Sequence, residues 1–123
     1  MTSEIKYKVS LERKDATNTL NVHTFTLWEK ILDQTLKRHY DGILSIGTSE
    51  ETPVFTDITN NGILLMINLS TANFVKWGVA TTVYTGRMIY GESAGPFRLE
   101  TGKSLFMISD TAVSDVRIIH YAA

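Results

Sequence analysis

The segment 62–78 constrains the fold of this chain most, because it reads as a buried strand, a short polar turn and a second strand. Residues 63–67 are apolar at every position, which is typical of a strand covered on both faces. After the turn, Val75 and Trp77 flank Lys76, which is typical of a strand with one buried face. The segment therefore predicts a β-sheet protein.

Short segments of β-type composition, separated by Gly, Pro, Asn and Ser, continue along the rest of the chain. They are residues 43–46, 54–58, 63–69, 74–79, 82–90, 97–99, 105–108 and 113–121. About eight short strands at this spacing predict an all-β fold, with a two-sheet antiparallel β-sandwich or jelly roll as its architecture. Because 123 residues suit one hydrophobic core and no linker or repeat divides them, we expect a single domain over residues 1–123.

The N-terminal third carries a second regular pattern. Apolar and polar residues alternate over residues 5–12, which predicts a half-exposed strand. The parity of the apolar positions then changes within residues 22–25, and a bulge near His23 or Thr24 accounts for the change. Residues 27–38 fit one short helix by their period, and a strand that continues from the preceding residues fits them as well. We therefore expect at most one short helix, near residues 27–38.

Composition excludes several classes of function. The 12 basic and 13 acidic residues nearly cancel and are scattered, so we expect no nucleic-acid partner. The absence of cysteine excludes a disulfide framework, thiolate catalysis and sulfur-ligated zinc. The longest apolar run is far shorter than the roughly 20 residues of a membrane span, and no leader pattern opens the chain. We therefore expect no membrane partner, no export signal and no cofactor.

One catalytic motif has a match in the sequence. Gly91–Gly95 satisfies the G-x-S-x-G pattern, in which Ser93 would be the nucleophile. That motif requires a strand, a tight turn and a helix, followed by an acid and then a histidine. Asp110 or Asp115 and then His120 do follow, but the segment directly after the motif is strand-like and not helical. The pattern favours a glycine-rich loop between two strands and a protein that is not an enzyme, with a small esterase as an alternative.

Metal ligands and paired carboxylates are weakly indicated. His39 and Asp41 would share one side of a strand, and His23 lies on another element, which is a loose pattern for a metal site. Glu50 and Glu51 are adjacent, and adjacent residues on an extended chain point apart, which does not suit a glycosidase pair. We therefore expect neither a metal site nor a carboxylate pair.

Aromatic residues and one strand-like segment suggest an interaction surface. The segment 82–90 combines tyrosine, methionine and arginine, which are enriched at the centres of protein interfaces. The predicted interface residues are Trp28, Tyr84, Arg87, Met88 and Tyr90. Two other interpretations remain open: a carbohydrate-binding face that includes Trp77, and ordinary packing in a sandwich core.

Three segments, residues 42–51, 68–78 and 109–113, carry a resemblance to a known family. They read GILSIGTSEE, NLSTANFVKWG and SDTAV. The chain resembles, from about Ile5 to Tyr121, a family of small proteins encoded by tailed bacteriophages. That family has an asparagine-leucine strand end, a Thr-x-Asn-aromatic-Val turn and an Ala-Asp-Thr-Ala segment before the last strand. This chain has Ser109 where alanine is usual.

The resemblance implies a virion component and provides no catalytic residues. It implies a capsid decoration (cement) protein, expected as a homotrimer, that binds the major capsid protein or other virion proteins and stabilises the head lattice. Such a protein is made in the host bacterial cytoplasm and resides in the virion. The alternatives are a neck or tail component that anchors fibres, a carbohydrate-binding module, and an esterase that uses Ser93.

Overall fold

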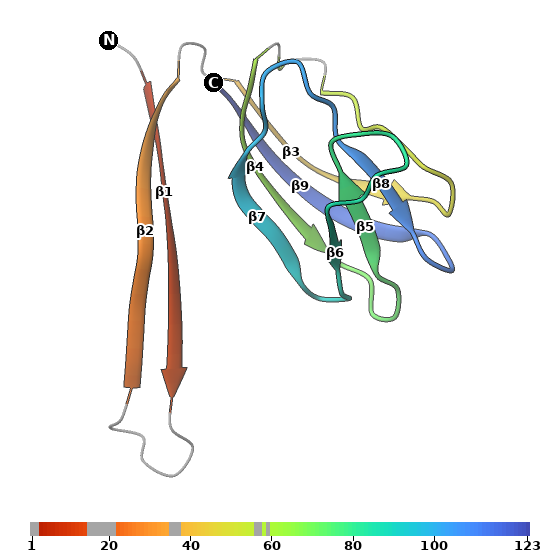
Figure 1. The fold of residues 1–123 in the computed structure, drawn as a ribbon, viewed down its shortest axis with the longest axis horizontal. Coiled ribbons are helices and arrows are strands. Elements are labelled where there is room, and N and C mark those ends of the chain that lie inside the picture. Colours follow the sequence, from red (N-terminus) through yellow and green to blue (C-terminus); the bar gives the residue numbers. More distant parts are fainter. Residues whose placement is uncertain (1–2, 15–21, 35–37, 56–57, 59) are drawn as a thin grey trace. The chain divides into compact units, whose positions relative to one another are not determined.

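The computed structural model describes residues 3–14, 22–34, 38–55, 58 and 60–123, and they form nine strands and no helix (Figure 1). The all-β class is therefore confirmed. The contacts group the chain into two compact units, Met1–Thr35 and Leu36–Ala123. The single domain over residues 1–123 stays a prediction, and the two units are described one at a time.

The first unit is a long antiparallel hairpin. Strand β1 (Ser3–Lys14) pairs with strand β2 (Val22–Gln34) along its whole length. The register shifts once: Val9 lies opposite Trp28 and Ser10 lies opposite Thr26, so Leu27 has no direct partner. Leu27 is therefore a β-bulge, one extra residue on one strand of the pair.

Two local predictions for this hairpin are wrong. Residues 27–34 form no helix, because β2 continues to Gln34 and its ladder with β1 supplies the backbone hydrogen bonds that a helix would have made internally. Residues 35–37 lie outside the described part of the chain. The bulge is at Leu27 and not near residues 23–24.

The second unit is a two-sheet β-sandwich of seven strands, and every neighbouring pair in it is antiparallel (Figure 1). The first sheet has the order β3 (His39–Ile46), β9 (Ser114–Ala122), β4 (Asn61–Asn68) and β7 (Ser93–Arg98). The second has the order β6 (Gly86–Met88), β5 (Val75–Gly78) and β8 (Phe106–Ser109). The sandwich is confirmed, whereas a jelly roll is not.

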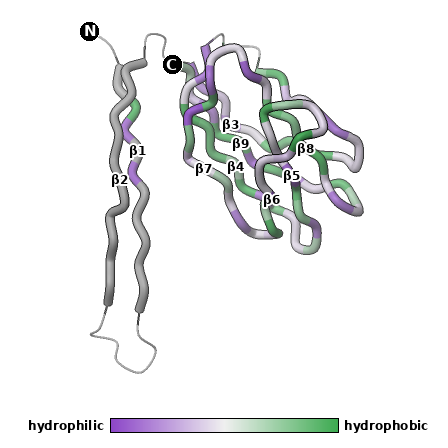
Figure 2. Tube along the Cα trace, in the orientation of Figure 1, coloured by the Kyte–Doolittle hydropathy of each residue, from purple (hydrophilic) through white to green (hydrophobic). Residues whose placement is uncertain are grey.

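The core lies between the two sheets. Its fully buried side chains come from both layers and are Ile46, Leu64, Met66, Val75, Met88, Leu105, Met107, Val116 and Ile118. Figure 2 shows the hydrophobic run along β4, the strand whose residues 63–67 were predicted to be covered on both faces. Leu65 and Ile67 alternate with the buried Leu64 and Met66 and are only half-buried. Ile63, which shares the outer face with Leu65 and Ile67, is buried, so within the described residues the outer face of β4 is covered only in part.

Candidate binding surface

A groove of about 410 Å³ runs over the strand pair β5–β6. Its cationic members are Lys76 on β5 and Arg87 on β6, which lie directly opposite each other in the register. We call this feature the cationic groove, and its lining residues are Lys76, Tyr84, Thr85, Gly86 and Arg87.

The connection from β5 to β6 is held tightly against β5. The amide of Val83 donates a hydrogen bond to the carbonyl of Ala80 (3.2 Å), and the amide of Thr85 donates one to the carbonyl of Trp77 (2.8 Å). Gly78 lies beneath this turn, where a Cβ atom would come within 2.2 Å of the Val83 carbonyl oxygen. Only glycine fits there, so Gly78 allows the connection to pack directly against β5.

Tyr84 is held in the groove by a carboxylate. Its hydroxyl donates a hydrogen bond to Glu50, which also accepts from the Thr81 hydroxyl (2.6 Å) and the Thr82 amide (2.8 Å). The bonds from Thr81, Tyr84 and Thr82 lower the pKa of the Glu50 carboxyl, and the bond to Glu50 raises the pKa of the Tyr84 hydroxyl. Glu50 is therefore ionised at neutral pH and engaged with three donors.

Each of the two cations has an aromatic ring nearby. Arg87 Cζ lies 4.0 Å from the centroid of the Phe74 ring, and Lys76 Nζ lies 6.0 Å from the centroid of the Tyr84 ring. In the part of the chain that the structure describes, neither cation forms an ion pair with an acidic residue. Arg117 on the other sheet differs, since it binds Asp41 through two hydrogen bonds. The groove therefore presents two adjacent positive charges without a counter-ion from the described residues.

Asn68, at the end of β4, anchors the far end of β6. Its side chain is fully buried, and its amide nitrogen donates to the carbonyls of Asn73 (2.9 Å) and Met88 (3.1 Å). Its side-chain oxygen accepts a hydrogen bond from the amide of Ser70 (3.0 Å). The side chain thus closes the turn after β4 and ties this turn to the last residue of β6.

The structure places the five predicted interface residues in different environments. Tyr84 and Arg87 line the cationic groove, and Tyr90 is exposed two residues beyond β6. Met88 is only 1% exposed and belongs to the core, so its assignment to the interface is wrong. Trp28 lies opposite Val9 in the hairpin, and its side chain is outside the described part.

The structure does not assemble the residues of the predicted esterase. Ser93 opens β7 and pairs with Ile67, so the stretch read as a glycine-rich loop is partly a strand, and no helix follows it among the described residues. Asp115 accepts a hydrogen bond from the hydroxyl of Ser45 (2.8 Å). His120 is fully buried, and neither of its ring nitrogens has a hydrogen-bond partner in the described structure.

The other candidate ligands are also engaged elsewhere. The ring of His39 lies 5.5 Å from that of Tyr121, and Asp41 is bound to Arg117, which lowers the pKa of the Asp41 carboxyl. Among the described residues, no three His, Asp or Glu side chains come together as a metal site, and the His23 side chain lies outside them.

The adjacent carboxylates diverge as predicted. Glu51 accepts a hydrogen bond from the amide of Gly47, whereas Glu50 binds the turn that carries Tyr84. The two groups therefore face different partners and do not form the opposed pair that a glycosidase needs.

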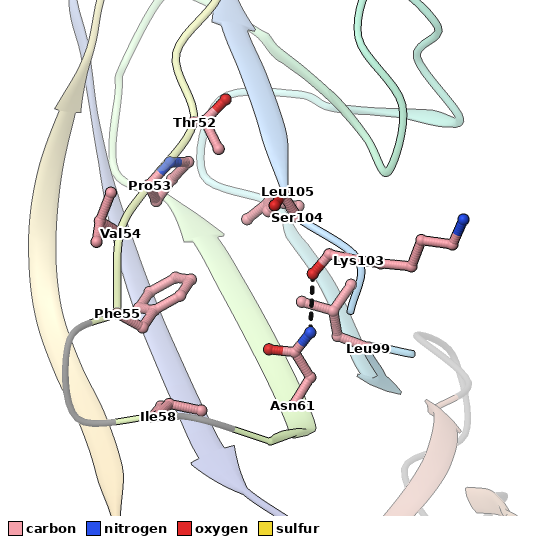
Figure 3. Close-up of a pocket in the computed structure, with 10 residues that line it drawn as sticks. All are labelled: Thr52, Pro53, Val54, Phe55, Ile58, Asn61, Leu99, Lys103, Ser104 and Leu105. Atoms are coloured by element: carbon pink, nitrogen blue, oxygen red, sulfur yellow. Dashed lines mark hydrogen bonds between the residues drawn. The ribbon is translucent and has the colours of Figure 1, made fainter. Parts of the chain in front are cut away.

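A smaller pocket of about 230 Å³ is lined by residues 52–55 and 58, by the start of β4 and by the segment 99–105 (Figure 3). Its floor includes the buried side chains of Leu99 and Leu105, and the Phe55 ring forms part of its wall. The side-chain amide of Asn61 donates to the carbonyl of Lys103 (2.8 Å), and the Lys103 ammonium extends away from the pocket. The pocket therefore has a mixed polar and apolar lining, and one side-chain amide crosses it to the backbone.

The carbohydrate interpretation depended on an accessible Trp77 ring. That ring is packed against the core and stacks on Phe97, with 5.1 Å between the ring centroids and 17° between the planes. One face of the ring is therefore taken by Phe97.

Within the described residues, no helix is long and apolar enough to cross a membrane. Comparisons with protein-family models, with curated proteins and with solved structures found no match to this chain.

Proposed function

We propose that this protein is a structural component of the virion of a tailed bacteriophage, namely a capsid decoration (cement) protein that binds and stabilises the head lattice. The observation that carries the proposal is the cationic groove, in which Arg87 lies over the Phe74 ring and Lys76 lies near the Tyr84 ring. Val83, Ile89 and Tyr90, in and beside the segment that forms the groove, are exposed apolar residues. Arginine and tyrosine together with exposed apolar side chains are typical of protein interfaces.

One of the segments that carry the sequence resemblance also contributes to the cationic groove. The segment 68–78, which carries part of the resemblance to phage proteins, forms the turn that Asn68 closes and the strand that bears Lys76. The residues that suggest the family therefore also build the proposed contact surface. A small rigid sandwich with such a surface suits a subunit that adds to a preformed lattice.

Binding to an assembled shell stabilises that shell without any chemical reaction. A ligand that binds only the assembled state shifts the equilibrium toward it by mass action, and the effect grows with the number of bound copies. We propose a trimer, because three symmetry-related grooves can then bridge neighbouring capsid subunits.

The proposal is tested by adding the purified protein to phage heads that lack it and measuring co-sedimentation. We expect the wild-type protein to sediment with heads and Arg87→Glu to lose most of this binding. Arg98→Glu is the matched control, because Arg98 is also an exposed arginine and the change in charge is the same. Binding to isolated necks or tails alone would favour the neck or tail alternative, and binding to none of these particles would refute a virion role.

A further inference from the structure

We propose that the cationic groove binds an acidic segment of a partner protein, whose carboxylates bridge Lys76 and Arg87. This inference rests on the proposed function, because it gives the chemistry of the partner that the same surface would contact. It follows from the positions of two charges, two rings and one sheet edge.

The two cations are placed to share one anionic group. Lys76 and Arg87 are direct partners across antiparallel strands, and such partners have Cβ atoms about 5 Å apart. Like charges at this spacing repel each other, and a bound carboxylate removes the repulsion. The guanidinium of Arg87 matches a carboxylate through two parallel hydrogen bonds, while the ammonium of Lys76 adds a point charge.

Of the two cations, Arg87 is held on a ring before a ligand arrives, and Lys76 has a ring at its side. Arg87 lies over the Phe74 ring, and Lys76 lies near the Tyr84 ring, which Glu50 fixes through its hydrogen bond. A side chain that is already held loses less conformational entropy when a ligand binds. The groove is therefore preorganised for an anion.

The surroundings favour a protein segment over a phosphate or a nucleic acid. A nucleic-acid backbone requires a longer track of positive charge than two cations provide. The exposed apolar side chains of Val83, Ile89 and Tyr90 suit a partner that presents both acidic and apolar residues. Strand β6 is also an edge strand of its sheet in the described structure, which leaves room for an extended segment beside it.

The test is a two-dimensional NMR titration of the full-length, ¹⁵N-labelled protein with an acetylated peptide of alternating glutamate and valine. We expect the largest shifts at the amides of Lys76, Tyr84 and Arg87. The double variant Lys76→Glu/Arg87→Glu should weaken the peptide at least about tenfold, and the control Arg98→Glu should change it less than about twofold. Raising the salt from about 50 to about 200 mM should also weaken binding.

Three results would overturn the inference. The first is peptide shifts that lie outside the groove or that respond equally to the double variant and to Arg98→Glu. The second is equally tight binding of inorganic phosphate, which would indicate a non-specific anion site. The third is tighter binding of a single-stranded oligothymidylate, which would make nucleic acid the occupant. Each variant must first give a dispersed spectrum, so that unfolding is not mistaken for lost binding.

The peptide and the particle experiments separate the two proposals. If the peptide binds in the groove while the protein fails to bind heads, the acidic ligand is retained and the head lattice as its source is refuted. If the protein binds heads while the peptide does not bind, the decoration role is retained and the acidic ligand is refuted.

Discussion

Replacing Asn68 by alanine should destabilise the β-sandwich strongly, because this one buried side chain makes hydrogen bonds to three backbone groups. The substitution removes the hydrogen bonds to the carbonyls of Asn73 and Met88 and the bond from the amide of Ser70. A net hydrogen bond contributes about 1 kcal/mol, and a buried acceptor left without a donor costs about 1–3 kcal/mol. We expect Asn68→Ala to lower the free energy of unfolding by about 3 kcal/mol, a large part of the 5–15 kcal/mol typical of a small protein.

Urea denaturation followed by tryptophan fluorescence measures this change. Thr71→Ala is the control in the same turn, because Thr71 is exposed and makes no side-chain hydrogen bond within the described residues, so we expect a change below about 0.5 kcal/mol. Asn68→Asp keeps the shape but sets carboxylate oxygens against two carbonyls, and it should destabilise at least as much as alanine. If Asn68→Ala cost no more than Thr71→Ala, the anchoring role of Asn68 would be refuted.

Two further predictions concern the core of the sandwich. Burial lowers the pKa of His120 to about 4, so the unfolded chain takes up this proton first as the pH falls. The stabilisation from the neutral, buried imidazole is complete above about pH 6.5. It is lost progressively down to about pH 4, by about 3 kcal/mol in all. The His120→Leu variant should lack this part of the pH dependence in urea denaturation at about pH 7 and about pH 4.5, and identical pH dependence in both proteins would contradict the assignment. Leu64→Ala should lower the free energy of unfolding by about 3 kcal/mol and the neighbouring Leu65→Ala by about 1 kcal/mol, because only Leu64 is fully buried. Equal losses would show that the faces of β4 are wrongly assigned.

The sequence predicts the class of this fold well because the strand signal is local. Alternation over residues 5–12 and the apolar run 63–67 both become strands. The helix near residues 27–38 fails because the choice there depends on β1, which lies far back in the sequence. A period of apolar residues does not reveal that a partner strand is available for pairing.

Strand β7 shows a different limit. Residues 91–95 were predicted as a glycine-rich loop and residues 97–99 as a strand, yet Ser93–Arg98 forms one strand that pairs with β4 through a register shift between Leu64 and Met66. Gly95 has a φ of 97°, and a Cβ atom there would lie 2.6 Å from the carbonyl oxygen of Leu64. The glycine that suggested a loop is therefore what allows two backbones to approach at an irregular point of the sheet. The strand predicted at residues 54–58 fails in the opposite way, since residues 54 and 55 belong to no strand.

The candidate surface was predicted in part. Residue type alone indicated Tyr84 and Arg87, and both line the groove. Met88 was indicated on the same ground, but it neighbours Arg87 on a strand and so faces the core. Alternation within β6 would have separated the two. Lys76 was missed as a binding residue because its role comes from its register with Arg87, which only the folded sheet reveals.

The central claim is a place in the head lattice, and the composition of native particles tests it most directly. The proposal implies a tailed phage whose genome encodes this chain. Tailless heads of such a phage are purified, and the copy number of the protein is measured by quantitative mass spectrometry after sedimentation. The account predicts that the protein travels with the tailless heads at a copy number comparable to that of the major capsid protein. Its loss together with the tails, or its absence from both heads and complete virions, would contradict the account.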